Sequence, residues 1–171
     1  MDETAVPARV TKSVTVAVIR QCHKHPRDGD GGHFAVVTED GFTIRIEDIK
    51  CDGVIVCSAN AQHKSSRLAN SILDAVGFSE ARRMVDWPAR EALRSAKTKV
   101  VVVNDADALW AGLKGKALRV AEAQLIYLSN TSGAKFVLVG GDAMARGVRG
   151  NPQLAWRYEL LRTAEHVRYF A

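Results

Sequence analysis

The sequence has few cysteines, and they are not arranged in pairs. Its 171 residues include three, Cys22, Cys51 and Cys57, and none belongs to a Cys-x-x-Cys motif. An odd, unpaired set argues against the disulfide framework of a small secreted domain. We therefore expect reduced thiols and a cytoplasmic protein.

Long apolar runs are also missing. No stretch approaches the roughly 18 apolar residues that a membrane-spanning helix needs. Asp2 and Glu3 stand near the start of the chain, with no apolar segment after them, so no secretory signal is predicted. We expect no membrane among the partners of this protein.

Charge of neither sign dominates. Lys and Arg number 24 against 19 Asp and Glu, which gives a net charge of +5. This excess permits contact with phosphate or nucleic acid, but an ordinary solvated surface carries as much. The length and the 47% hydrophobic content suit one domain around a single core. No internal repeat or low-complexity tract is present.

The first quarter of the chain is the least regular in pattern. Residues 1–13 are expected to form a flexible segment, followed by an apolar stretch, Val14–Cys22, whose alternation fits either a helix or a strand. The polar segment 23–33 is rich in Gly and Asp and is predicted to be a loop. Two alternating runs then meet at Asp40-Gly41, a pair favoured in tight turns, which predicts an N-terminal β-hairpin.

Strand and helix patterns alternate through the rest of the chain. Short apolar runs at 54–57, 100–103 and 136–139 are typical of buried parallel strands. Helical spacing appears at 68–76, before a Gly77 stop, and again at 88–96 and 116–129. This order predicts a single α/β domain over 14–171, with a mostly parallel sheet and helices on both faces.

The run at 54–57 is followed by residues that partly match a phosphate-binding loop. Such a loop reads Gly-x-x-x-x-Gly-Lys-Ser/Thr between a strand and a helix. Here Lys64-Ser65 stands in the expected place, but Ser58 and His63 replace the two glycines. A side chain at His63 obstructs the close approach of phosphate that glycine allows, so the cradle is expected to be altered.

Acidic residues follow the run at 100–103. Asn104 comes first, and Asp105 and Asp107 follow it. In proteins that hydrolyse a nucleotide bound at such a loop, a neighbouring strand ends in an Asp-Glu pair. The Asp lies near the magnesium ion, and the Glu orients the water that attacks the phosphate. Asn brings no charge, and Asp is shorter than Glu, so hydrolysis is expected to be slow or absent. Simple solvation of a strand end is the alternative explanation.

The stretch from Val100 to Phe170 resembles the AAA+ ATPases of DNA transposition, of the TniB/TnsC type. Four features carry the resemblance: the strand ending in Asn104-Asp105-Ala106, Asn130, the strand 136–140 ending in Gly, and the motif 153–157, Gln-Leu-Ala-Trp-Arg. The resemblance extends less specifically back to residue 53. It implies a P-loop core that binds ATP with magnesium.

The resemblance also implies roles for single residues. Asp105 would take the catalytic acidic position, and Arg157 would reach the nucleotide of a neighbouring subunit. Ser65 and Asn104 would hold the magnesium ion. The nucleotide-binding set would be Ser58, Asn60, His63, Lys64, Ser65 and Asn104. The chain ends soon after Arg157, so the helical lid usual in AAA+ proteins is expected to be absent.

The basic residues in the region of the resemblance can also be explained without a catalytic or DNA-binding role. Arg157 lies between Trp156 and Tyr158, where an arginine commonly stacks on an aromatic ring at the surface. The proteins of the resemblance contact DNA through basic loops that follow the acidic strand, which implies DNA contact here. The corresponding residues are Lys114, Lys116 and Arg119. Ordinary solvated charge is the alternative for this set.

The densest set of metal-ligating residue types lies between positions 22 and 33. Its members are Cys22, His23, His25 and His33. Zinc favours such residues, but their spacing matches no established zinc motif. A solvated turn rich in Gly and Asp is the preferred interpretation.

The sequence therefore predicts a divergent AAA+ protein of DNA transposition, with weak or absent ATP hydrolysis. It is expected to form homo- or hetero-oligomers and to bind DNA, a transposase or a related AAA+ subunit. One alternative is an active ATPase of the same family, in which Asp105 or Asp107 supplies the missing acid. The other is an α/β protein-interaction module that binds no nucleotide.

Overall fold

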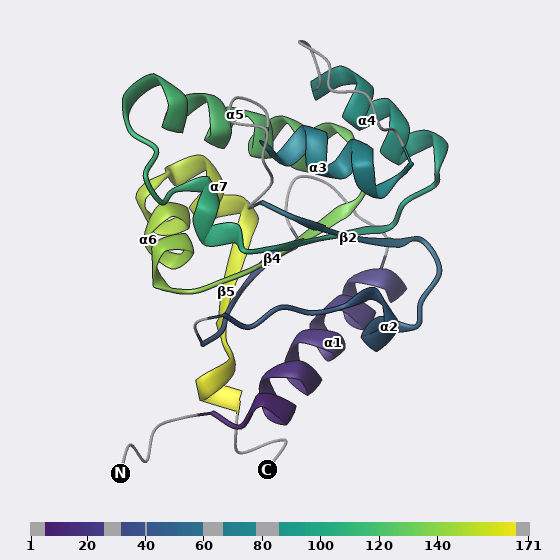
Figure 1. Ribbon diagram of the computed structural model, residues 1–171, viewed down its shortest axis with the longest axis vertical. Helices are drawn as coiled ribbons and strands as arrows, with labels where there is room; N and C mark the ends of the chain where they lie inside the picture. The colour runs from purple at the N-terminus through teal and green to yellow at the C-terminus, as the bar shows by residue number, and fades with distance from the viewer. Residues whose placement is uncertain (1–5, 26–31, 40, 60–66, 78–85, 167–171) are drawn as a thin grey trace.

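A five-stranded parallel sheet organises the chain (Figure 1). The computed structural model describes residues 6–25, 32–39, 41–59, 67–77 and 86–166. The strands are β1 (His33–Val37), β2 (Val54–Ser58), β3 (Val100–Asn104), β4 (Lys135–Gly140) and β5 (Tyr158–Arg162). Their order across the sheet is β2-β3-β4-β1-β5, and every pair is parallel. The predicted α/β fold with a mostly parallel sheet is confirmed.

Burial on both faces explains why the central strands are so apolar. All five residues of β3 are buried. Val101 and Val103 pack into the hydrophobic cluster on one face, and Val100 and Val102 into the cluster on the other. This is the alternation that a pleated strand imposes on successive side chains.

Helices cover both faces, as predicted (Figure 1). One face carries α1 (Ala8–Lys24) and the short α2 (Ile46–Ile49). The opposite face carries α3 (Arg67–Ala75), α4 (Asp86–Ser95), α5 (Gly115–Thr131), α6 (Asp142–Gly150) and α7 (Pro152–Arg157). Two 3-10 turns complete the described elements, η1 (Ala106–Leu109) and η2 (Thr163–His166). None of the described helices is long and apolar enough to cross a membrane.

The predicted N-terminal hairpin is wrong. β1 has β4 along one edge and β5 along the other, so no edge remains for a hairpin partner. Residues 42–45 form no strand, and the chain continues directly into α2. The alternation in this run instead reflects burial of Ile44, which is 1% exposed and packs with α1 and α2.

The ambiguous stretch Val14–Cys22 is helical, as part of α1. α1 begins at Ala8, so the latter half of the segment predicted to be flexible is also helix. Val10 and Val14 are buried along one side of it, at the spacing of one helical turn. Burial of this face of α1 explains why residues 8–13 are helical.

Candidate functional site

The strand order creates a switch point between β1 and β4. After β1 the chain passes along the face that carries α2 to reach β2, at the far edge of the sheet. After β4 it passes along the opposite face, through α6 and α7, to reach β5. Because the two connections diverge, the carboxyl ends of β1 and β4 open a crevice. Ligands of open α/β sheets bind at such positions.

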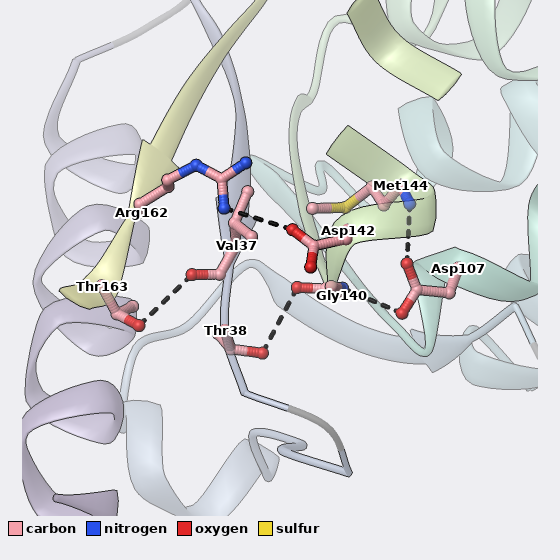
Figure 2. A network of polar contacts seen from close by, with 9 residues as sticks. Val37, Thr38, Asp107, Gly140, Asp142, Met144, Arg162 and Thr163 are labelled. Atoms are coloured by element: carbon pink, nitrogen blue, oxygen red, sulfur yellow. Dashed lines mark hydrogen bonds and ion pairs between the residues drawn. The ribbon is translucent and has the colours of Figure 1, made fainter. Parts of the chain in front are cut away.

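A cavity of about 300 Å³ lies at this crevice, and residues at or directly after the ends of β1, β4 and β5 surround it. Figure 2 shows the polar contacts that join these strand ends. Thr163 donates from its hydroxyl to the Val37 carbonyl at 3.2 Å. Thr38 approaches the Gly140 carbonyl in the same way, at 3.4 Å. Hydroxyls from two segments thus bridge the ends of three strands.

Charged groups border the same cavity. The Arg162 guanidinium contacts the Asp142 carboxylate at 3.3 Å (Figure 2). The Glu39 carboxylate accepts a bond from the Val6 N–H at 2.6 Å, which ties the segment before α1 to the end of β1. Two carboxylates and one guanidinium give the cavity a mixed, slightly acidic lining.

Sequence reasoning missed this site. Thr38 and Arg162 are more than a hundred positions apart, and only the strand order brings β1 beside β5. The one local signal was Asp142 directly after a strand ending in Gly140-Gly141.

The predicted phosphate loop follows β2, which is an edge strand paired only with β3. Ser58, the last residue of β2, donates from its hydroxyl to Asp105 at 2.8 Å. The other members of that expected set, Asn60, His63, Lys64 and Ser65, lie outside the described residues.

Asn104 is bound to the chain itself. Its side-chain oxygen accepts from the Ile44 N–H at 3.1 Å, and its side-chain nitrogen donates to the Ile44 carbonyl at 2.8 Å. Asn104 is 7% exposed. The amide thus acts like a piece of backbone that holds the segment after β1 across the carboxyl end of β3. The amide that the sequence places beside magnesium is therefore hydrogen-bonded to the backbone of Ile44.

The two aspartates after Asn104 have separate partners. Asp105 has a left-handed backbone conformation, with φ 52°, and its carboxylate accepts a hydrogen bond from the Ser58 hydroxyl. Asp107 accepts from the N–H groups of Gly141 and Met144, at 2.9 and 2.7 Å (Figure 2). Asp107 therefore caps the start of α6, where a negative charge also suits the helix dipole.

Arg157 is held at the end of α7 by three contacts. Its Nε donates to the Asn130 side chain at 2.8 Å, and a terminal nitrogen donates to the Gln153 carbonyl at 2.8 Å. The guanidinium also lies 5.2 Å from the ring centre of Trp156, which is 67% exposed. The expected stacking is present, and the side chain has a fixed direction.

The residues predicted to contact DNA lie together at the start of α5. Lys114 directly precedes the helix, and Lys116 and Arg119 belong to its first two turns. All three are exposed. They lie on the sheet face that carries α3 to α7.

The residues between 22 and 33 do not converge. His33 is buried as the first residue of β1, and its ring nitrogen accepts from the Phe136 N–H at 3.0 Å. Burial raises the pKa of the Cys22 thiol to about 11, which disfavours the thiolate that a metal needs. No group of three or more His, Cys, Asp or Glu side chains within the described ranges is placed to hold a metal ion.

Comparison with known proteins identifies the family. The chain matches the family model described as "Bacterial TniB protein" over residues 39–167, well over half of its length. No curated protein matches the chain. Membership implies ATP binding and a part in transposition. The chain belongs to the TniB family, the transposition-associated AAA+ ATPases.

Proposed function

We propose that this chain acts in DNA transposition as an assembling AAA+ subunit with little or no ATP hydrolysis of its own. The observation that carries the proposal is the pair of hydrogen bonds between Asn104 and Ile44. The residue expected beside magnesium brings no charge, and its amide oxygen and nitrogen each make a hydrogen bond inside the chain. A metal ion bound by this amide would compete with its two hydrogen bonds to Ile44, which is almost completely buried.

The turn after β1 supports the same conclusion. In doubly wound sheets the glycine-rich phosphate turn follows the strand at the switch point and leads into a helix. Residues 38–45 here read Thr-Glu-Asp-Gly-Phe-Thr-Ile-Arg, without a Gly-Lys pair. The helix that follows, α2, has four residues. This turn lacks the lysine and the long helix of a phosphate cradle.

Contacts with other molecules supply the function in this proposal. Lys114, Lys116 and Arg119 contact the DNA backbone, because they are exposed lysine and arginine side chains gathered at one helix start. Arg157 contacts a neighbouring subunit or a related AAA+ protein. Its fixed direction beside the exposed Trp156 lowers the entropy lost when a partner binds.

Titration with a fluorescent ATP analogue and magnesium tests the proposal. We expect no turnover, and binding that is weak or absent at millimolar nucleotide. Lys64→Ala should then change nothing. Lys24→Ala, a change at an exposed lysine at the end of α1, is the matched control.

The other outcomes separate the alternatives. Saturable binding with turnover, both lost in Lys64→Ala and kept in Lys24→Ala, would overturn the proposal in favour of an active ATPase. If the protein binds neither nucleotide nor DNA and does not associate with itself, the result would favour a protein-interaction module.

A further inference from the structure

We infer that the DNA-contacting surface extends from the start of α5 onto α6, and that it binds the phosphate backbone without reading sequence. We call it the α5–α6 basic surface. Its members are Lys114, Lys116, Arg119, Arg146 and Arg149. The inference rests on the proposed DNA contact and adds the arginines of α6 to it.

Among the described residues, the cations of this surface have no anionic partner. All five are exposed, and in the part of the chain that the structure describes no ion pair involves any of them. The surface therefore keeps its positive charge available for an external anion.

The carboxylates nearby are already engaged. η1, α5 and α6 each contain one acidic residue. Asp107 caps α6, Glu122 accepts from the Asn151 side chain at 2.9 Å, and Asp142 pairs with Arg162. None of the three is bonded to a cation of the α5–α6 basic surface.

The basic residues at the start of α5 destabilise that end of the helix when no anion is bound. Basic side chains oppose the positive end of a helix dipole, and the first turn of α5 contains no acidic residue. The side chain of Lys114, at the capping position, makes no capping hydrogen bond. A phosphate group would satisfy both the exposed N–H groups and the lysines.

A close contact also joins α6 to the loop that precedes α5. The indole of Trp110, which follows η1, lies so close to Gly147 of α6 that a Cβ there would be 2.4 Å from three ring atoms. In Figure 1 the chain from η1 to α5 rises along the side of the molecule that carries α6. The end of α6 also lies beside α5, since Asn151, the residue directly after α6, donates to Glu122 of α5 at 2.9 Å. These contacts make α6 a neighbour of the segment that begins α5.

The composition of the surface favours nucleic acid over an acidic protein. Val120 is the one large exposed apolar side chain described on α5 and α6. A protein interface of ordinary affinity needs buried aromatic or aliphatic anchors. Three of the five cations are arginines, which hold phosphate oxygens through paired N–H donors.

The test is the salt dependence of binding to DNA duplexes of two unrelated sequences, followed by fluorescence anisotropy. We expect Arg146→Gln/Arg149→Gln to weaken binding equally for both. The slope of log K against log salt should fall by about 1.8, since each phosphate contact contributes about 0.9. Arg94→Gln, at an exposed arginine of α4, is the matched control and should bind like the wild type.

Several outcomes would overturn the inference, and they differ in what they leave standing. If the α6 variant binds like the wild type while Lys114→Gln/Lys116→Gln weakens binding, the extension is wrong and the proposed DNA contact stands. If the wild-type chain binds no duplex, the proposed DNA contact and its extension onto α6 are both wrong. If polyglutamate displaces DNA at equal charge concentration, the surface serves an acidic protein. Thermal unfolding followed by circular dichroism confirms that each variant is folded.

Discussion

The side chain of Asn104 and the backbone of Ile44 form a two-bond pair, with one bond accepted and one donated. They are sixty positions apart, yet the pair joins the end of β3 to the segment that leaves β1. An amide carries its donor and its acceptor on two separate atoms, which matches the N–H and the carbonyl of one residue. Aspartate at this position would offer only acceptors when ionised.

Replacing Asn104 by Asp should therefore destabilise the protein. The Ile44 carbonyl would lose its donor and would face a buried negative charge, at a cost of about 1–3 kcal/mol. Denaturant unfolding measures the effect. Asn130→Asp is the matched control, because the Asn130 oxygen accepts from Arg157 and aspartate would still accept there. Equal stability of Asn104→Asp and the wild type would contradict the pairing.

Replacing Gly147 by Ala should also destabilise the protein, although alanine favours a helix by about 1 kcal/mol over glycine. The added methyl group would meet the Trp110 indole at 2.4 Å. Overpacking of this kind costs about 1–3 kcal/mol. Gly150→Ala is the matched control, since its Cβ would meet nothing within 4 Å. A melting temperature for Gly147→Ala at or above that of Gly150→Ala would show that the contact is absent.

Cys57 should make stability fall at alkaline pH. Burial raises the pKa of its thiol from 9.0 to about 12. The unfolded chain therefore loses this proton near pH 9 while the folded chain keeps it. The contribution of the thiol is complete below pH 9 and is lost as the pH rises toward 12.

Unfolding free energies measured from pH 8 to pH 10.5 test this expectation. The wild type should lose stability more steeply than Cys57→Ala, and Cys51→Ala, at a half-exposed position, should follow the wild type. Parallel curves for all three proteins would rule out the contribution of Cys57.

Arg157→Ala should weaken association between subunits. The substitution removes the group held over the exposed Trp156 and the partly buried bond to Asn130. Sedimentation velocity with DNA and nucleotide present measures the assembled fraction. Arg94→Ala is the control on a different helix. If assembly, and the ATPase rate of an added active AAA+ subunit, are both unchanged by Arg157→Ala, the proposed contact is wrong.

The sheet strands were largely predictable, because their signals are local. The run at 100–103 is buried on both faces and is apolar at every position, so it could hardly be anything but a central strand. The helices at 68–76, 88–96 and 116–129 were recognised from spacing, and each lies within two residues of the observed ends. These features depend on neighbours within one helical turn or one strand.

The candidate site was less predictable, because it depends on strand order. Phe42, Ile44 and Ile46 alternate with polar residues as a strand would, yet β1 has no free edge to accept them. Nothing near Ile44 in the sequence indicates that Asn104 holds it. The crevice residues Thr38 and Arg162 likewise meet only after β1 has been placed between β4 and β5.

The central position of β1 also determines where this chain can be divided. The family match begins at residue 39, just after β1 ends. A fragment cut at that boundary would lose α1 and the strand that pairs with both β4 and β5, and would split the sheet in two. The matched region alone therefore lacks the strand that joins β5 to the rest of the sheet, and a fragment that keeps the sheet whole has to begin ahead of α1.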